Sequence, residues 1–135
     1  MRNYILLLFL MMLMLPVWYF GMYRADFVLL KVENGEIDLA SALSGSWDSV
    51  CILNPYTTVE QAEQATGLWI NVANRSDISW SDSISLLVTR NGDELGGLYE
   101  VGRKNVDFTR FGSQCFDRAD SKFSVATTGH PDALR

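Results

Sequence analysis

The sequence predicts an α+β protein, in which an N-terminal transmembrane helix precedes a small, mostly antiparallel sheet with one short helix and one disulfide. Three observations support this fold class: an uncharged apolar run near the N-terminus, short β-branched segments between turn-forming residues, and a single pair of cysteines. We divide the chain into a signal anchor over residues 1–24, an extracytoplasmic α+β domain over 25–126 and a flexible tail over 127–135.

The predicted transmembrane helix covers residues 4–23, which carry no charge and lie between Arg2 and Arg24. At about 1.5 Å per residue this run reaches roughly 30 Å, the thickness of a bilayer's hydrocarbon core. A cleaved signal peptide would end in small residues, and Tyr19 and Tyr23 fit that pattern poorly. We therefore expect a single-pass protein of the inner (plasma) membrane with its C-terminal domain in the periplasm or an equivalent space. Secretion after signal cleavage is the alternative.

The two cysteines, Cys51 and Cys115, predict a disulfide, because an even pair in an exported domain is usually oxidised. Closing a loop of about 65 residues would stabilise the fold by roughly 4 kcal/mol in the chain-entropy model. Two buried free thiols are the alternative. A metal site is not expected, because two cysteines and one distant histidine, His130 in the predicted tail, cannot complete a zinc site.

The middle of the chain predicts a buried strand followed by a capped helix. Residues 49–53 are apolar and β-branched, as in a buried strand. Thr57 or Thr58 begins the helix in a capping box with Glu60 or Gln61, and Gly67 is its C-terminal cap. Residues 68–72 then predict a second strand, with Trp69 in the core.

A β-hairpin is the clearest local prediction, over residues 83–101. Asn91 and Gly92 suit the centre of a type I′ turn, which would place Val88 opposite Leu95. The adjacent glycines at 96 and 97 indicate a bulge or a close neighbour. Residues 27–32 form either an extension of the N-terminal helix or a first strand, Asn34–Gly35 a turn, and residues 122–126 a last strand.

Charge and motifs restrict the function classes. Residues 25–135 hold nine Lys and Arg against sixteen Asp and Glu, a formal charge of −7. This charge disfavours nucleic acid and suits a basic partner, although solubility alone also explains it. No cofactor is expected and no catalytic motif occurs, so the chain is not expected to be an enzyme. The carboxylate pairs Glu33 with Glu36 and Asp93 with Glu94 are interpreted as solvated turn residues rather than as an acid and a base.

Trp47 and Trp80 are the candidate partner contacts, because both stand beside serine and aspartate in loop-like segments. Aromatic side chains are favoured at the centres of interfaces and also in cores, so core packing is the alternative for each.

Residues 46–123 resemble small bacterial exported envelope proteins of unknown function that contain two paired cysteines. The resemblance rests on the order SWDSVCILNPYTT, VEQAEQATG, a hairpin, QCF and RADSKF. It implies a compact α+β envelope domain and no specific activity.

The sequence therefore predicts a membrane-tethered module that binds a protein partner of unknown identity at the membrane surface. An inhibitor, an immunity factor or an accessory subunit of an envelope complex would fit. A structural subunit that acts through its helix in the lipid bilayer, over residues 4–23, is the first alternative. An envelope enzyme that uses carboxylates is the last.

Overall fold

The computed structural model describes the backbone of residues 2–22 and 24–125 and, within the first helix, the side chains of residues 3–15. The predicted tail over 127–135, with His130, lies outside the described residues. The helices are α1 (Arg2–Met22), α2 (Leu39–Ala42), α3 (Val59–Thr66) and α4 (Val72–Arg75), with the 3₁₀ turns η1 (Thr109–Phe111) and η2 (Arg118–Asp120). The strands are β1 (Asp26–Phe27), β2 (Glu36–Asp38), β3 (Ser49–Leu53), β4 (Ile84–Asn91), β5 (Glu94–Gly102), β6 (Gln114–Asp117) and β7 (Lys122–Ser124).

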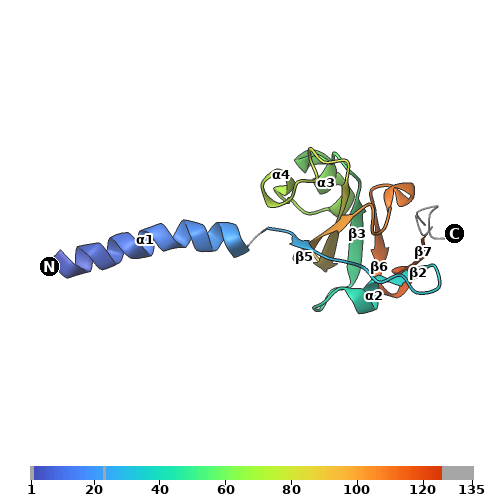
Figure 1. Ribbon diagram of the computed structural model, residues 1–135, viewed down its shortest axis with the longest axis horizontal. Coiled ribbons are helices and arrows are strands. Elements are labelled where there is room, and N and C mark those ends of the chain that lie inside the picture. Colours follow the sequence, from blue (N-terminus) through green and yellow to red (C-terminus); the bar gives the residue numbers. More distant parts are fainter. Residues whose placement is uncertain (1, 23, 126–135) are drawn as a thin grey trace, which may run out of the picture.

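Five strands form one mixed sheet in the order β1-β5-β4-β3-β6. Strand β1 runs parallel to β5, and the other neighbours in this sheet are antiparallel. Strands β2 and β7 form a separate antiparallel ribbon. Helices α3 and α4 lie on one side of the sheet, whereas α2 and the β2–β7 ribbon lie on the other (Figure 1). We call these two sides the helical face and the aromatic face.

Strand β3 is buried at every position because both of its faces are covered. Val50 and Ile52 point to the core of the aromatic face, and Cys51 and Leu53 to the core of the helical face. This alternation is the period of two that a strand imposes on its side chains. The predicted strand over residues 49–53 is confirmed.

The aromatic face takes its name from four phenylalanines that pack in mutual contact. Phe123 lies 4.8 Å from Phe116 and 4.9 Å from Phe111 between ring centroids, and Phe108 lies 6.4 Å from Phe123. These separations and the tilted ring planes are those that aromatic pairs prefer. The cluster connects β6, β7 and η1, so it holds the C-terminal third of the domain against the sheet.

On the helical face, α3 is the capped helix that the sequence predicts. The hydroxyl of Thr58 accepts from the backbone N–H of Gln61, and the Gln61 side chain accepts from the backbone N–H of Thr58. Gly67 ends α3 with a left-handed φ of 71°. The capping box and the glycine cap are confirmed. The strand predicted over residues 68–72 is wrong, since this segment is irregular and leads into α4.

The β4–β5 hairpin forms, but its predicted register is wrong. Val88 pairs with Leu98 rather than Leu95, because the turn is centred on Gly92 and Asp93 and β5 contains one extra residue. A register shift at Thr89 leaves Gly96 as the extra residue, which confirms the predicted bulge. A Cβ at Gly96 would lie 2.6 Å from the Thr89 hydroxyl, so only glycine fits there.

The type I′ geometry occurs instead at the first Asn-Gly pair. Asn34 and Gly35 both have positive φ, 53° and 74°, and the backbones of Glu33 and Glu36 exchange two hydrogen bonds of 2.9 Å around them. At the second pair only Gly92 has positive φ. Its N–H donates to the Asp48 carboxylate at 2.7 Å, and this bond holds the pKa of Asp48 below its usual value. A neighbouring side chain therefore takes part in setting the second turn.

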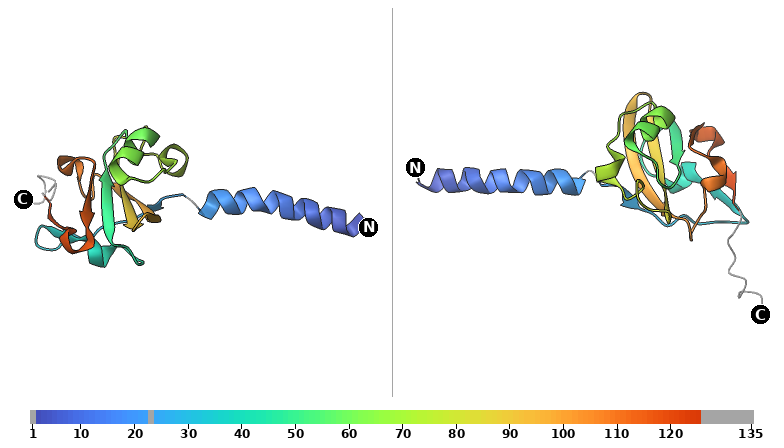
Figure 2. Two further views of the ribbon diagram at one scale, coloured as in Figure 1. Left: turned by 180° about the vertical axis from the view of Figure 1, so that it is seen from behind. Right: turned by 90° about the horizontal axis from the view of Figure 1, so that it is seen from above.

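Helix α1 projects from the domain (Figure 2). Its side chains from Tyr4 to Leu15 are 50% to 75% exposed. Among the residues that the structure describes, no helix combines the length and the apolar character needed to cross a bilayer. The predictions of a transmembrane helix over residues 4–23 and of a single-pass membrane location are therefore wrong.

Candidate protein-binding surface

The predicted disulfide between Cys51 and Cys115 is present. The two residues are direct partners in the register of β3 and β6, with Cα atoms 3.8 Å apart. The Cys115 Sγ atom also contacts the carbonyl oxygen of Ala65 at 3.1 Å. The disulfide therefore fixes the edge strand β6 beneath α3 on the helical face.

Trp47, the first predicted partner contact, lies in the core of the aromatic face and is only 4% exposed. Its indole N–H donates to the carbonyl of Leu43 at 3.3 Å, so its one polar group is satisfied. The guanidinium of Arg118 lies 4.5 Å above the ring and donates to the carbonyls of Trp47, Gly45 and Ala40. The loop that looked exposed in the sequence is thus closed by an arginine from a distant segment.

Trp80, the second predicted contact, is 60% exposed. Two further aromatic residues, in the loops before and after α3, are exposed: Tyr56 at 58% and Trp69 at 69%. The prediction that Trp69 packs in the core is wrong, because its neighbours Ile70 and Val72 are buried instead. Alternation around Ile70 was the sequence signal that could have placed Trp69 outside.

Backbone and side-chain bonds fix the loop that presents Trp80. The Glu100 carboxylate on β5 accepts from the Ser76 hydroxyl at 2.7 Å and from the Asp77 N–H at 3.1 Å. The Trp80 N–H donates to the Asp77 carbonyl at 3.2 Å, and the Tyr56 N–H donates to Ile78 at 2.7 Å. Trp80 therefore stands on a segment that is anchored to both the sheet and the start of α3.

The segment that carries these tryptophans is acidic, and one of its carboxylates, Asp77, pairs with Arg24 at 3.5 Å. Between Asn54 and Asp82 the chain holds four carboxylates and one cation, Arg75, a formal charge of −3. All four carboxylates belong to exposed residues, Glu60, Glu63, Asp77 and Asp82. We call Trp69, Trp80 and these four acids the acidic tryptophan surface.

The carboxylate pairs considered in the sequence lie elsewhere. Glu33 forms an ion pair with Lys31 at 2.6 Å, which lowers the pKa of Glu33, and Glu36 pairs with Lys122 at 3.0 Å. Asp93 and Glu94, the second pair, are exposed at the tip of the β4–β5 hairpin. Within the described ranges, no cluster of three or more potential metal ligands occurs.

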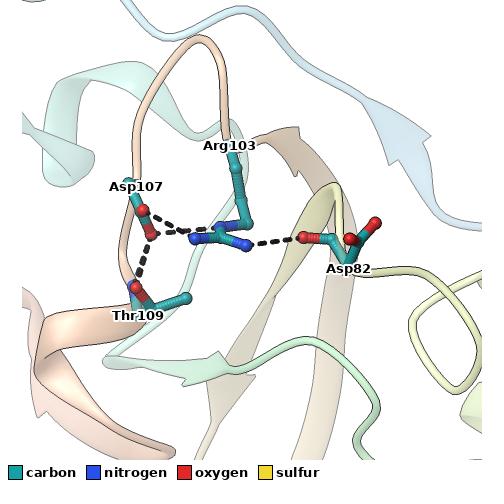
Figure 3. A network of polar contacts seen from close by, with 4 residues as sticks. All are labelled: Asp82, Arg103, Asp107 and Thr109. Atoms are coloured by element: carbon teal, nitrogen blue, oxygen red, sulfur yellow. Dashed lines mark hydrogen bonds and ion pairs between the residues drawn. The ribbon is translucent and has the colours of Figure 1, made fainter. Parts of the chain in front are cut away.

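A further carboxylate, Asp107, belongs to a structural network (Figure 3). Arg103 donates to Asp107 at 3.0 Å and 3.3 Å and to the carbonyl of Asp82 at 2.9 Å. The Thr109 hydroxyl and N–H donate to the same carboxylate. The hydrogen bonds from Arg103 are the main reason that the pKa of Asp107 falls to about 2. This network fixes the loop that carries Phe108 into the aromatic cluster.

No protein-family model, no curated protein and no solved structure shows significant similarity to this chain.

Proposed function

We propose that this protein is a binding module that holds a basic protein partner on the acidic tryptophan surface. The observation that carries the proposal is the exposure of Trp69 and Trp80, at 69% and 60%, in a domain that buries Trp47. Exposed tryptophans lose favourable burial when they face water, and interface centres are rich in them. A partner that covers both would recover that free energy.

The charge around the tryptophans selects the chemistry of the partner. Exposed carboxylates at Glu60, Glu63, Asp77 and Asp82 lie on the elements that present Trp69 and Trp80. Lysine and arginine side chains pair with such carboxylates and also stack on indole rings. The acidic residues would act mainly on the rate of encounter and on specificity, and the tryptophans on the lifetime of the complex.

Affinity purification with matched variants tests the proposal. The full chain, the double variant Trp69→Ser/Trp80→Ser and the control Leu29→Ser are produced at equal levels and used to recover bound proteins. Leu29 is a good control because it is 77% exposed and lies outside the surface. We expect the same basic protein with the original chain and the control, and at least about tenfold less with the double variant.

Salt dependence gives a second measurement. Raising the ionic strength from about 0.05 M to 0.5 M should weaken recovery, because the Debye length becomes shorter. Unchanged recovery by the double variant, or a recovered partner that is acidic, would refute the proposed surface.

A further inference from the structure

A second surface feature of the helical face is a hollow of about 420 Å³ between the end of β3, helix α3 and the loop before β6. Its polar lining consists of three amides and two hydroxyls, and its two other lining residues are apolar. The polar residues are Asn54, Thr57, Gln61, Gln64 and Ser113. None of the lining residues is charged, although the domain around them carries many carboxylates. We call this hollow the amide pocket.

Several of these groups retain hydrogen-bonding capacity. The Asn54 side-chain oxygen is buried and has no hydrogen-bond partner within the described part of the chain. The Gln61 oxygen accepts from the Thr58 N–H at 3.0 Å, which leaves the Gln61 NH₂ group to donate. The Ser113 hydroxyl oxygen accepts from the Asn54 N–H at 3.2 Å, so its own hydrogen can be donated. The Asn54 oxygen itself is closed off from solvent, but the exposed Gln64 amide offers both a donor and an acceptor, so the pocket supplies both kinds of group.

An unusual backbone conformation occurs beside the pocket. Tyr56 has φ of 64°, a left-handed value that costs free energy for an aromatic residue. Its chain neighbours Pro55 and Thr57 both line the pocket, and its own side chain is 58% exposed. Backbone strain of this kind is concentrated at ligand-binding sites, where the surrounding structure holds it in place.

The geometry points to a binding site for a neutral sugar ring of a glycan in the amide pocket. Hydroxyl groups of a sugar both donate and accept, so they match the mixed amide and hydroxyl lining. The apolar face of a sugar ring packs well on an aromatic side chain, and the exposed Tyr56, whose chain neighbours line the pocket, would supply one. The volume lies within the range of small-molecule sites.

Other ligand classes fit the lining less well. A charged ligand would lose hydration without gaining an ion pair, because no lining residue is charged. An apolar ligand would take the amide and hydroxyl groups of the lining out of water without giving them partners. The charged hollow next to β2 is the weaker site, since Lys31 and Lys122 are already paired with Glu33 and Glu36.

Nuclear magnetic resonance of the ¹⁵N-labelled full chain tests the site with named sugars. The neutral trisaccharides are cellotriose, maltotriose and tri-N-acetylchitotriose, and trigalacturonate is the charged control. We expect at least one neutral trisaccharide to shift the side-chain amide signals of Asn54 and Gln64 with saturation, and trigalacturonate to leave them unchanged. No saturable shift at up to about 20 mM of any neutral sugar, or equal binding of trigalacturonate, overturns the inference.

Matched variants show whether the pocket is responsible. Gln64→Leu replaces an exposed side chain and should weaken binding at least about tenfold without unfolding the protein. Asn74→Leu, at an exposed amide on α4 that does not line the pocket, should bind as the original chain does. Affinity that is unchanged in Gln64→Leu overturns the inference.

Tyr56→Gly gives a readout that a purely structural role would not produce. Glycine adopts positive φ without strain, so the unfolding midpoint should stay the same or rise, while sugar affinity falls at least about tenfold. Trp69→Ser/Trp80→Ser should keep its sugar affinity. Loss of the protein partner and loss of the sugar are thus separately measurable. Sugar affinity that survives in Tyr56→Gly overturns the role of Tyr56 in this site.

Discussion

The two faces of the sheet use aromatic residues in opposite ways. On the aromatic face, Phe108 is fully buried and Trp47 is only 4% exposed, and both belong to the core. On the helical face the core is aliphatic and contains the disulfide, whereas Trp69 and Trp80 remain exposed. Aromatic residues are thus a structural requirement on one face and available for recognition on the other. Five predictions test this difference, from the largest expected effect to the smallest.

Phe108→Ala should lower the free energy of unfolding by about 3–5 kcal/mol, because it empties a fully buried ring site. Phe108→Leu keeps most of the volume and should cost under about 2 kcal/mol. Urea unfolding of both variants measures the difference. A loss below about 1 kcal/mol for the alanine variant would mean that the aromatic cluster is not the main support of its face.

Removing the disulfide should weaken the helical face. The double variant Cys51→Ala/Cys115→Ala should lose about 2–4 kcal/mol of unfolding free energy, since the bond closes a separation of 64 residues. Reductant should lower the urea midpoint of the original chain and leave that of the variant unchanged. An original chain that ignores reductant would contradict this prediction.

Arg118→Ala should cost about 2 kcal/mol, because one guanidinium donates to three carbonyls and covers Trp47. Arg118→Lys should recover only part of this, since an ammonium lacks the planar donor geometry. Arg110→Ala is the control: its guanidinium lies 4.7 Å from the Phe111 ring but is exposed, so its loss should cost less than about 1 kcal/mol. Equal losses of unfolding free energy in Arg118→Ala and Arg110→Ala would mean that the buried contacts of Arg118 add nothing beyond an exposed cation–π contact.

The Asp107 network should make the aromatic face sensitive to acid. The pKa of Asp107 is lowered from 3.8 to about 2, so its stabilisation is present above pH 3.8 and is lost as the pH falls toward 2. The side chain is 32% exposed, and we expect about 1 kcal/mol after allowance for solvent screening. Urea unfolding between pH 5 and about 2 should show less acid dependence in Asp107→Asn. Identical pH profiles would refute this role.

The exposed tryptophans should contribute least to stability. Trp69→Ser and Trp80→Ser should each change the free energy of unfolding by about 0.5 kcal/mol or less, because both side chains already face water. Trp47→Ser should cost several times more, since it opens a cavity under Arg118. The three variants have the same chemical change, so chemical denaturation compares position alone. A large loss of unfolding free energy in Trp80→Ser would show that Trp80 packs against the domain and would contradict this prediction.

Local features of the fold were predictable from the sequence. Thr58, Gln61 and Gly67 define the ends of α3 through bonds within one or two turns of chain, and short-range patterns contain that information. The bulge beside Gly96 was predictable for the same reason, because a missing Cβ indicates a close neighbour.

Long-range features were not predictable in the same way. The hairpin register depends on Asp48, which binds Gly92 from 44 residues away. The burial of Trp47 depends on Arg118, which arrives from the far end of the domain. Trp80 was a candidate from its polar neighbours, whereas Trp69 was missed because an aromatic residue in an apolar run looks like core. The amide pocket is lined by residues that precede the hairpin in the sequence and by Ser113, which follows it, so no spacing in the chain indicates the pocket.

The bond between Cys51 and Cys115 also has a consequence for proteolysis. It makes a covalent ring of the intervening chain, which includes α3, α4, the hairpin, both exposed tryptophans and every polar group of the amide pocket. A single protease cut between residues 52 and 114 would therefore release no fragment until the bond is reduced. A nicked molecule would migrate as two pieces only on a reducing gel, and its recognition surfaces would remain on one particle.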